Sequence, residues 1–429
     1  MRVLMFGWEF PPHIAGGLGT ACKGIVEGLA HNGVETLFVM PSASGDEDQS
    51  CTTIINASDV EVHNVSQTVD EFLDKVKFIH VDSNLVPYVD PDEYFEAIEK
   101  MKKEKRTSTT VGFGQKFKFS GKYGANLMEE VSRYAQVGGT IAMQHAGEFD
   151  VIHAHDWLTY LAGIAAKELS GKPLVVHVHA TSFDRGSDDM VDTRVYAIEK
   201  RGMEMADRVV AVSELTRNIV INKYGIDPSK VVAVHNAVDF SGRENLQVER
   251  GVRDKVVTFL GRIPYQKGPE YFIDAAAKVL KRTKGVRFVM AGSGDMMNKA
   301  IRQVARLGIA DRFHFTGFLR GSDVQKMFAL SDVYIMPSVS EPFGISPLEA
   351  MRSNVPSIIS YQSGAAEILK YAFKVDFWDV DAMADDIYAL LQYPALSKFA
   401  EKHGLEEVNA LKWDHAAAKL KNIYEQITK

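Results

Sequence analysis

The sequence predicts an α/β protein with two doubly wound domains, in which helices cover both faces of a parallel sheet. Short apolar runs alternate with segments of helical periodicity up to His235, and a second alternation starts at Lys255. Such alternation requires crossover connections and therefore parallel sheets. Residues 240–254 are charged and lack an apolar period, which is typical of an interdomain linker. We therefore expect an N-terminal domain over residues 1–245 and a C-terminal domain over residues 250–405.

In the first domain, strands are predicted from short apolar runs bounded by glycine, proline or polar residues. The runs are Arg2–Phe6, Val34–Val39, Phe149–His153, Pro173–His179, Arg208–Ser213 and Val231–His235. Apolar residues at helical spacing predict helices at Thr20–His31, 125–145, Thr193–Ala206 and Thr216–Tyr224, and a further helix that closes near Leu169. Gly171 is placed to cap this last helix at its C-terminus.

The second domain repeats the pattern. Its predicted strands are Val256–Leu260, Val286–Met290, Arg312–Thr316, Val333–Met336 and Val355–Ser360. A helix is expected from the glycine-containing turn at Gly292-Ser-Gly294 to Leu307. Near the terminus, Trp413, Ala417, Leu420 and Tyr424 share one helical face, which predicts a final amphipathic helix.

The segment Ser42–Tyr123 has no clear periodicity. A short edge strand is expected at Phe78–Val81, and the basic run Lys100–Arg106 reads as a solvated face. Asp46 and Asp48 resemble a metal-binding aspartate pair, but they lie in a polar loop of the kind found at surfaces. We interpret them as surface residues.

Composition excludes several classes of protein. The chain has 429 residues, a net charge of −7 and 46% hydrophobic residues, which favours a globular protein and argues against a nucleic-acid binder. Its two cysteines, Cys22 and Cys51, provide no disulfide framework. The N-terminus lacks a secretory signal, and no apolar run approaches the roughly 18 residues of a membrane helix. We expect a cytoplasmic protein without an integral membrane segment.

The stretch after Val333–Met336 concentrates the candidate chemistry. Ser346 is a suitable N-cap and Glu349, three residues later, completes a capping box, so that Glu349 has a purely structural interpretation. The loop before it also holds Glu341 and Gly344, and a helix N-terminus after such a loop can bind an anion. Structural and functional interpretations both remain open from these residues alone.

The motif Glu341-Pro-Phe-Gly-x-x-Pro-Leu-Glu349 resembles the signature of retaining GT-B glycosyltransferases, a group that includes bacterial glycogen and starch synthases. The resemblance implies two Rossmann-like domains facing a cleft. It also implies that Glu349 binds the ribose hydroxyls of a sugar nucleotide and that Glu341 binds a hydroxyl of the donor sugar. Gly344, Ile345 and Ser346 belong to the same expected donor-binding segment.

Two further loops fit the family. Arg262 and Lys267 follow a predicted strand, and cations in such a loop are ordinarily just solvated. The family, however, has Gly-Arg-x-x-x-x-Lys-Gly at this place. The resemblance therefore implies that Arg262 and Lys267 bind the donor diphosphate. Gly292 ends the next strand, a position that suits nucleotide contact. Similarly, the family's Gly-Gly-Leu loop, here Gly16-Gly17-Leu18, faces the diphosphate from the first domain.

Two His-x-His pairs, His153 with His155 and His177 with His179, end neighbouring strands, and period two places each pair on one side of its strand. Such pairs raise the alternative of a metal-dependent hydrolase. However, no further carboxylate or cysteine completes a metal site. The phrase His153-Ala-His-Asp-Trp157 resembles the acceptor-side segment of glycogen synthases, which implies that His155 lies beside the transferred sugar.

Together, these resemblances predict a retaining hexosyltransferase that needs no metal or cofactor besides its donor, UDP-glucose or ADP-glucose. His155, Glu341, Arg262 and Lys267 are the expected catalytic residues. An α-glucan is the expected acceptor. The alternatives are a cell-envelope mannosyl- or glucosyltransferase and, from other classes, a metal-dependent hydrolase or a non-catalytic binder of sugar nucleotides. The family also implies that residues 406–429 cross back to the first domain.

Overall fold

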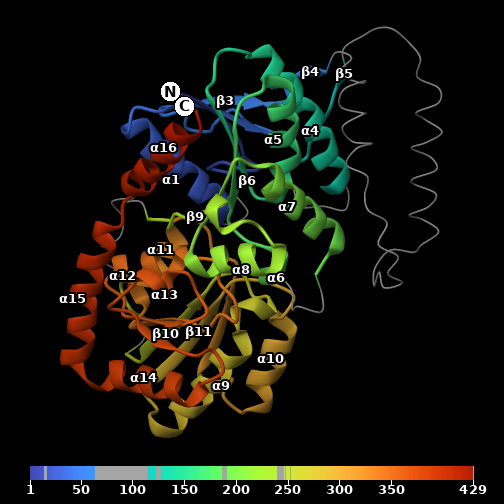
Figure 1. The fold of residues 1–429 in the computed structure, drawn as a ribbon. Helices are drawn as coiled ribbons and strands as arrows, with labels where there is room; N and C mark the ends of the chain where they lie inside the picture. The colour runs from blue at the N-terminus through green and yellow to red at the C-terminus, as the bar shows by residue number, and fades with distance from the viewer. Residues whose placement is uncertain are drawn as a thin grey trace, which may run out of the picture.

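A computed structural model describes residues 1–13, 17–62, 115–121, 127–185, 191–238, 246, 248–251 and 253–428. Two parallel sheets, each with helices packed on it, form the upper and lower halves of the molecule in Figure 1. The predicted α/β class is confirmed. The predicted edge strand Phe78–Val81, the basic run Lys100–Arg106 and most of the predicted linker lie outside the described residues.

The N-terminal sheet has the strand order β3-β2-β1-β6-β7-β8-β9, and all its pairings are parallel. Its strands are β1 (Arg2–Phe6), β2 (Glu35–Met40), β3 (Thr53–Asn56), β6 (Val151–His155), β7 (Leu174–Val178), β8 (Arg208–Ala211) and β9 (Val231–Ala233). The helices are α1 (Gly17–His31), α4 (Leu127–Gln144), α5 (Trp157–Ser170), α6 (Ser182–Arg185), α7 (Thr193–Met205) and α8 (Glu214–Tyr224). A short antiparallel pair, β4 (Glu61–Val62) with β5 (Gln115–Lys116), lies beside this sheet.

The C-terminal sheet has the order β12-β11-β10-β13-β14-β15, again entirely parallel. Its strands are β10 (Lys255–Leu260), β11 (Val286–Ala291), β12 (Phe313–Gly317), β13 (Val333–Met336), β14 (Ser357–Ser360) and β15 (Phe373–Val375). Its helices are α9 (Pro269–Arg282), α10 (Met297–Arg306), α11 (Ser322–Leu330), α12 (Ile345–Arg352), α13 (Ala365–Ile368), α14 (Val380–Gln392) and α15 (Pro394–Ala410). Both sheets therefore have the doubly wound order of Rossmann-like domains.

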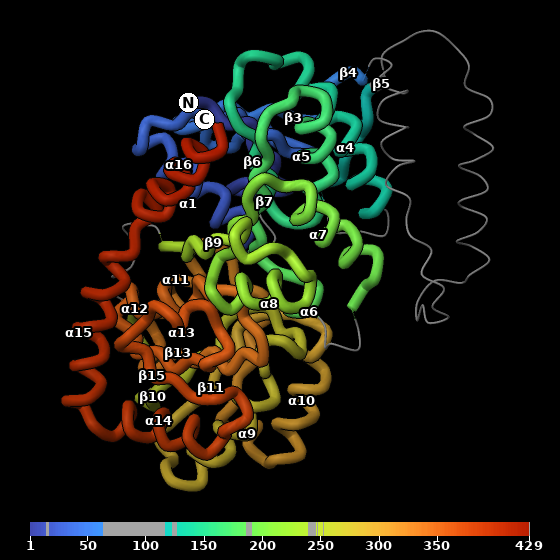
Figure 2. Tube along the Cα trace, in the orientation of Figure 1, coloured from blue at the N-terminus to red at the C-terminus, as the bar shows by residue number. Residues whose placement is uncertain are grey.

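The last helix, α16 (Trp413–Ile427), packs on α1 of the N-terminal domain, and Figure 2 shows both termini close together at the top of the molecule. Two glycines of α1 make room for it. A Cβ at Gly24 would lie 2.2 Å from the Trp413 ring, and one at Gly28 would lie 2.7 Å from the Trp413 carbonyl oxygen. The Tyr424 hydroxyl reaches Nδ1 of His153 at 2.6 Å. The crossing expected of the last helix is therefore present, but it begins at Trp413 rather than at residue 406, because α15 extends to Ala410 and packs on α12 and α14.

Most predicted elements agree with the structure within a few residues, and Gly171 caps α5 with φ of 69° and an N–H bonded to the Lys167 carbonyl oxygen. Two differences matter for the site. Helix α1 begins at Gly17 rather than Thr20, and α12 begins at Ile345. Several elements had no counterpart in the prediction: strands β3, β4, β5 and β15 and helices α6, α11, α13, α14 and α15. None of the helices in the described part of the chain combines the length and the apolar character that crossing a bilayer requires.

Candidate active site

The candidate site lies where the strand order of each sheet reverses, between β1 and β6 and between β10 and β13. Ligands of open parallel sheets bind beyond the carboxyl ends of the strands at such points. His155 ends β6. The loop after β10 carries Arg262 and Lys267, and the loop after β13 carries Glu341. The four residues expected to be catalytic therefore lie at the carboxyl end of a strand or in the loop after it, at the two reversal points.

The two sets of loops face each other. Ser340 Oγ, after β13, donates a 2.7 Å hydrogen bond to Oδ1 of Asp184, which follows β7 in the other domain. A Cβ at Gly17, at the start of α1, would lie 3.8 Å from Cδ1 of Ile345, at the start of α12. Two residues of the expected donor-binding set, one from each domain, thus lie opposite each other.

The start of α12 corrects the predicted helix cap. Gly344, with φ of 97°, is the N-cap and makes no side-chain cap bond, whereas Ser346 and Pro347 already lie inside the helix. The predicted Ser346–Glu349 capping box is wrong because the helix starts two residues early, after a backbone conformation that favours glycine. The structural explanation of Glu349 as a capping residue is thereby removed.

Glu341 and Lys267 form an ion pair across the two loops. Glu341 is 8% exposed, and Lys267 ends a short 3-10 turn at Tyr265–Lys267. The resemblance assigns one residue to the donor sugar and the other to the diphosphate, groups that are joined in a sugar nucleotide. Since the two side chains touch, a sugar nucleotide can contact both of them around the bond that joins its sugar to its diphosphate.

Arg262 is exposed and has no ion-pair partner among the residues that the structure describes, so its guanidinium is available to an anion.

The neighbouring Gly292 has a structural reason to be glycine. Its φ is 150°, and a Cβ there would lie 1.8 Å from the Gly261 carbonyl oxygen. The Ile263 amide donates to the Ser293 carbonyl oxygen at 2.9 Å, which ties the two strand-end loops together. Contact between Gly292 and a donor stays a prediction.

Glu349 is half-buried on α12, and no described residue donates a hydrogen bond to its carboxylate. Burial raises the pKa of the Glu349 carboxyl, and the nearby Arg352 lowers it, with a net upward shift. A partly desolvated carboxylate without a donor is destabilised unless a ligand supplies one. This environment suits the binding of a hydroxyl pair.

In the expected Gly-Gly-Leu loop, Gly16 lies outside the described residues. Gly17 is exposed as the first residue of α1, and Leu18 is partly buried against both hydrophobic cores of its domain. The Gly19 amide is taken by the buried Glu9, whose Oε1 accepts its hydrogen bond at 3.1 Å. A carboxylate of the chain therefore already occupies one amide of this helix N-terminus.

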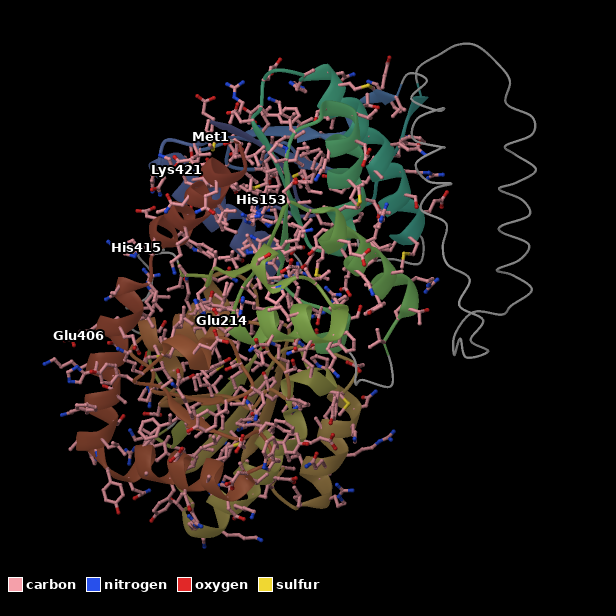
Figure 3. The ribbon with its side chains drawn as sticks, in the orientation of Figure 1. Met1, His153, Glu214, Glu406, His415 and Lys421 are labelled. Atoms are coloured by element: carbon pink, nitrogen blue, oxygen red, sulfur yellow. The ribbon has the colours of Figure 1, made fainter. Side chains whose placement is uncertain are left out.

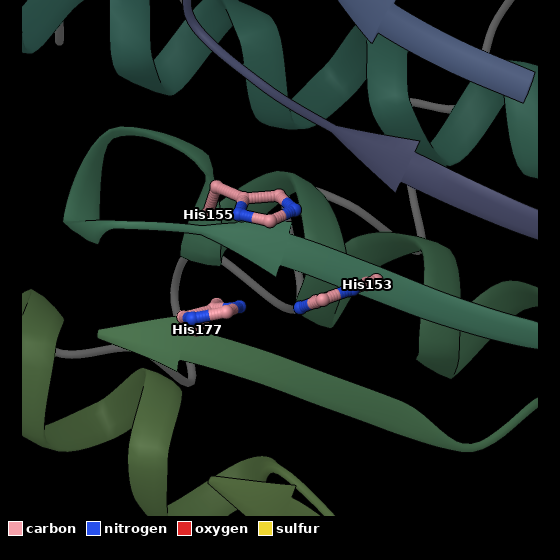
Figure 4. Close-up of side chains that lie close together, drawn as sticks. All are labelled: His153, His155 and His177. Atoms are coloured by element: carbon pink, nitrogen blue, oxygen red, sulfur yellow. The ribbon is translucent and has the colours of Figure 1, made fainter. Parts of the chain in front are cut away.

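The two His-x-His pairs form one stack because β6 and β7 are neighbours and His155 pairs in register with His177. Figure 4 shows His153, His155 and His177 side by side on these strands. The His153 and His177 rings are 5.3 Å apart and 10° from parallel, and His155 Nδ1 lies 2.9 Å from His179 Nε2. Nε2 of His155 makes no hydrogen bond within the described structure, although the ring is fully buried.

The stack is uncharged. Burial, and then the neighbouring histidines, hold the pKa of His155 well below its ordinary value, and burial does the same for His177. His155 can therefore offer a neutral hydrogen bond to a sugar hydroxyl, not a positive charge.

Ligand nitrogens of His153, His155 and His177 lie within 4.8 Å of one another, and imidazole is a ligand that zinc, copper and nickel accept. The ring planes argue against a metal centre. Because a nitrogen lone pair lies in its ring plane, rings within 10–32° of parallel direct their lone pairs alongside one another rather than to one point. Asp46 and Asp48 also fit the surface interpretation, since Asp46 pairs with His13 at 2.9 Å and Asp48 accepts from a backbone amide.

Asp156, next to His155, was not singled out in the sequence. Its φ of 59° is unusual for a residue other than glycine. Its buried carboxylate accepts hydrogen bonds from the His179 and Ala180 amides at 2.8 and 3.2 Å, and Arg185 lies 3.6 Å away. Asp156 thus ties the end of β6 to the end of β7 and holds the histidine stack in place. Nothing in the sequence reports a backbone angle, so the only available signal was its place in the His-Ala-His-Asp-Trp phrase.

His153 predicts a measurable pH dependence of stability. Burial, with a contribution from His179, lowers the pKa of His153 to about 3. In the unfolded chain this histidine has an ordinary pKa near 6.5, so it is protonated there before it is protonated in the folded protein. The folded state is therefore progressively destabilised as the pH falls below 6.5. From pH 7.5 to 5.5, His153 should account for about 1.4 kcal/mol of lost unfolding free energy. Urea unfolding at the two pH values measures the loss.

The control is His153→Gln, whose amide keeps a polar group near the Tyr424 hydroxyl without titrating. Between pH 7.5 and 5.5, the unfolding free energy of this variant should fall by about 1.4 kcal/mol less than that of the parent. An unchanged pH dependence in His153→Gln would show that this histidine is not held neutral.

Two family models match the chain. "Glycosyl transferases group 1" matches residues 243–405, and "Glycosyltransferase Family 4" matches residues 124–241. An uncharacterized glycosyltransferase of Methanocaldococcus jannaschii is 28% identical over 451 residues, covering 99% of this chain and 98% of that protein. A glycogen synthase of Mycobacterium tuberculosis is 22% identical over 431 residues, covering 99% of this chain and 94% of the enzyme.

Solved structures share the fold over the whole length. Sucrose-phosphate synthase from Thermosynechococcus elongatus superposes with a TM-score of 0.70 at 17% identity, covering 99% of this chain and 98% of that one. An Anabaena protein crystallised with UDP and glucose superposes with a TM-score of 0.65 at 16% identity, covering 99% and 100%. These likenesses show the fold.

Two Rossmann-like domains with facing loops, matched over residues 124–241 and 243–405 by glycosyltransferase family models, make the chain a glycosyltransferase of the GT-B class. Within that class it is of the family 4/5 type.

Proposed function

We propose that this glycosyltransferase moves a hexosyl group, in the first instance glucosyl, from a sugar nucleotide to a glycan acceptor of the α-glucan type, with retention of configuration. The observation that carries the proposal is the contact between Glu341 and Lys267 at the strand-order reversal of the C-terminal sheet. It places a carboxylate suited to the donor sugar next to a cation suited to the diphosphate. The glycogen synthase relative supports the choice of glucose and glucan.

Each residue then has a distinct task. The half-buried Glu349 accepts hydrogen bonds from the ribose hydroxyls, and the exposed Arg262 joins Lys267 on the diphosphate. Glu341 binds a hydroxyl of the donor sugar. His155, whose ring is neutral, lines the reaction centre from the end of β6 in the N-terminal domain. The leaving phosphate takes the acceptor proton on the face from which it departs, which leaves the new bond with the donor's configuration.

The reaction is proposed to need no metal ion. Lys267, Arg262 and the free amides at the start of α12 supply positive potential where the leaving diphosphate gains charge. The near-parallel histidine rings and the surface pairing of Asp46 support this part of the proposal.

The test offers UDP-glucose, ADP-glucose and GDP-mannose to the purified protein, with and without glycogen and with and without EDTA, and measures release of nucleoside diphosphate. Glycogen-dependent release from a glucose nucleotide, unchanged by EDTA, is expected. Release from GDP-mannose alone would favour the cell-envelope type of enzyme. Loss of turnover on chelation with recovery on adding manganese would refute metal independence, and binding without turnover would indicate a receptor.

Glu349→Gln should raise the Michaelis constant for the donor about tenfold and leave turnover at saturation within about threefold, because an amide accepts hydroxyl hydrogen bonds less strongly than a carboxylate. Stability should not fall, since burial already disfavours the charge at this position. Donor kinetics and melting temperature measure the two effects. Glu406→Gln, at an exposed position on α15, is the matched control. A variant that melts early yet binds donor normally would return Glu349 to a structural role.

A further inference from the structure

The two domains touch through the segment that follows β8. Ser213 Oγ donates a 2.6 Å hydrogen bond to the Pro342 carbonyl oxygen, and the fully buried Val212 packs in one apolar cluster with Phe343. The domains also approach closely at Gly364, where an added Cβ would lie 2.6 Å from Cβ of Ser213 in the N-terminal domain and 2.3 Å from the Pro342 carbonyl oxygen in its own domain. No larger residue fits between the domains in this arrangement.

Glu367, one turn further along, reaches from α13 to the N-terminus of α8 in the other domain. Its Oε2 accepts a hydrogen bond from the Glu214 amide at 2.9 Å, and its Oε1 accepts one from the Leu215 amide at 2.7 Å. His235 Nε2 lies 2.6 Å from the same Oε2. Figure 3 labels Glu214 near the boundary between the two halves. A carboxylate at the first amides of an 11-residue helix is favoured by the helix dipole.

The environment of Glu367 favours its ionised form. Burial raises the pKa of the Glu367 carboxyl, but the hydrogen bonds from His235 and from the Glu214 and Leu215 amides outweigh burial, and the net pKa is lowered. The charge that binds α8 is therefore present at neutral pH.

The same segment is bonded to the loop that carries Glu341. The Glu341 amide donates to the Gln362 carbonyl oxygen at 2.9 Å, and the Gly364 amide donates back to the Glu341 carbonyl oxygen at 3.0 Å. The Ala365 amide donates to the Phe343 carbonyl oxygen at 2.7 Å. A displacement of α13 therefore displaces the backbone of Glu341.

We propose that Glu367 is a positioning residue, which holds the two domains together by binding the N-terminus of α8 and thereby fixes Glu341 opposite the N-terminal domain. Glu367 touches neither donor nor acceptor in this account. The kinetic part of the inference rests on the proposed transfer reaction, whereas the structural part does not.

The test compares Glu367→Ala with Glu407→Ala. Glu407 is a matched control because its carboxylate also accepts backbone hydrogen bonds, from Lys370 and Tyr371, but within one domain. Glu367→Ala should lower turnover at saturating donor at least about tenfold, with the donor Michaelis constant within about threefold, because a misplaced Glu341 affects the transition state more than donor binding. Glu407→Ala should leave turnover within about twofold.

A distance measurement separates this role from general damage. Spin labels at Glu168→Cys and Lys284→Cys, both exposed and one in each domain, are introduced with Cys51→Ser, while the buried Cys22 stays unlabelled. Pulsed EPR without substrate should show a single narrow distance distribution in the parent and a broader, longer one in Glu367→Ala. If the alanine variant does not fold, Glu367→Gln, which keeps one acceptor oxygen, should show the same change to a smaller extent.

An unchanged distance distribution in the Glu367 variants overturns the inference, whether or not turnover falls. A broadened distribution with turnover within about twofold of the parent overturns the link to Glu341. If the distribution broadens while the parent turns over no sugar nucleotide at all, the contact stands and the proposed function fails.

Discussion

Glu341→Gln is expected to lower turnover at least about 100-fold while changing donor affinity less than about threefold. When the glycosidic bond breaks, positive charge develops on the donor sugar, and a fixed, nearly buried carboxylate stabilises that charge far more than it stabilises the neutral sugar. Glutamine keeps the shape and hydrogen-bonding oxygen but removes the charge. Steady-state kinetics and donor binding by calorimetry measure the two effects.

The substitution also leaves Lys267 without its ion-pair partner, so stability must be followed in parallel. Lys267→Met combined with Glu341→Gln is the control, since it removes both charges together and avoids an unpaired cation. If Glu341→Gln turns over within about threefold of the parent while folded, the carboxylate has no part in the reaction.

Lys267→Ala is expected to lower turnover about 100-fold and to weaken donor binding less than about tenfold. Negative charge on the leaving diphosphate grows as the bond breaks, so an ammonium placed there contributes more in the transition state than in the bound donor. In the free protein Lys267 is paired with Glu341, and donor binding must redirect or share that contact. Part of the intrinsic donor affinity is therefore offset by loss of the pair.

Lys278→Ala is the matched control because Lys278 pairs with a carboxylate, Asp381, on the exposed surface of the same domain. It should leave kinetics unchanged. The turnover losses of Glu341→Gln and Lys267→Ala should also be non-additive. The variant that carries both substitutions should turn over about as slowly as the slower of the two single variants. An unchanged maximal rate in folded Lys267→Ala would remove the lysine from the mechanism, and fully additive losses would show that the pair does not act as a unit.

The sequence predicted the α/β fold with two parallel sheets and its strand-end loops well, because apolar periodicity and loop punctuation are local properties. The apolar runs before these loops were enough to place Arg262, Lys267 and Glu341 on them. The ion pair between Lys267 and Glu341 was not predictable, since it depends on β10 and β13 being neighbours in the sheet. The histidine pairs show the same limit. The alternation of side chains along a strand predicted that both histidines of a pair lie on one side of it, but the stacking of the two pairs depends on the register between β6 and β7.

Backbone conformation accounts for the errors at the site. Ser346 has the chemistry of an N-cap, but the positive φ of Gly344 starts α12 earlier. Asp156 has a backbone angle that no sequence pattern reports. Glu367 follows β14 in the sequence, and only the packing of the two domains brings it to the N-terminus of α8. Long-range contacts of this kind are outside the reach of local patterns.

The most direct test of the central claim is the anomeric configuration of the bond that the enzyme makes. The product formed from the glucose nucleotide that supports turnover is purified, and the coupling constant of its new anomeric proton is measured by NMR. Retention predicts an α linkage from the α-linked donor. A β-linked product would contradict the same-face reaction at Glu341 and His155 and, with it, the proposed mechanism.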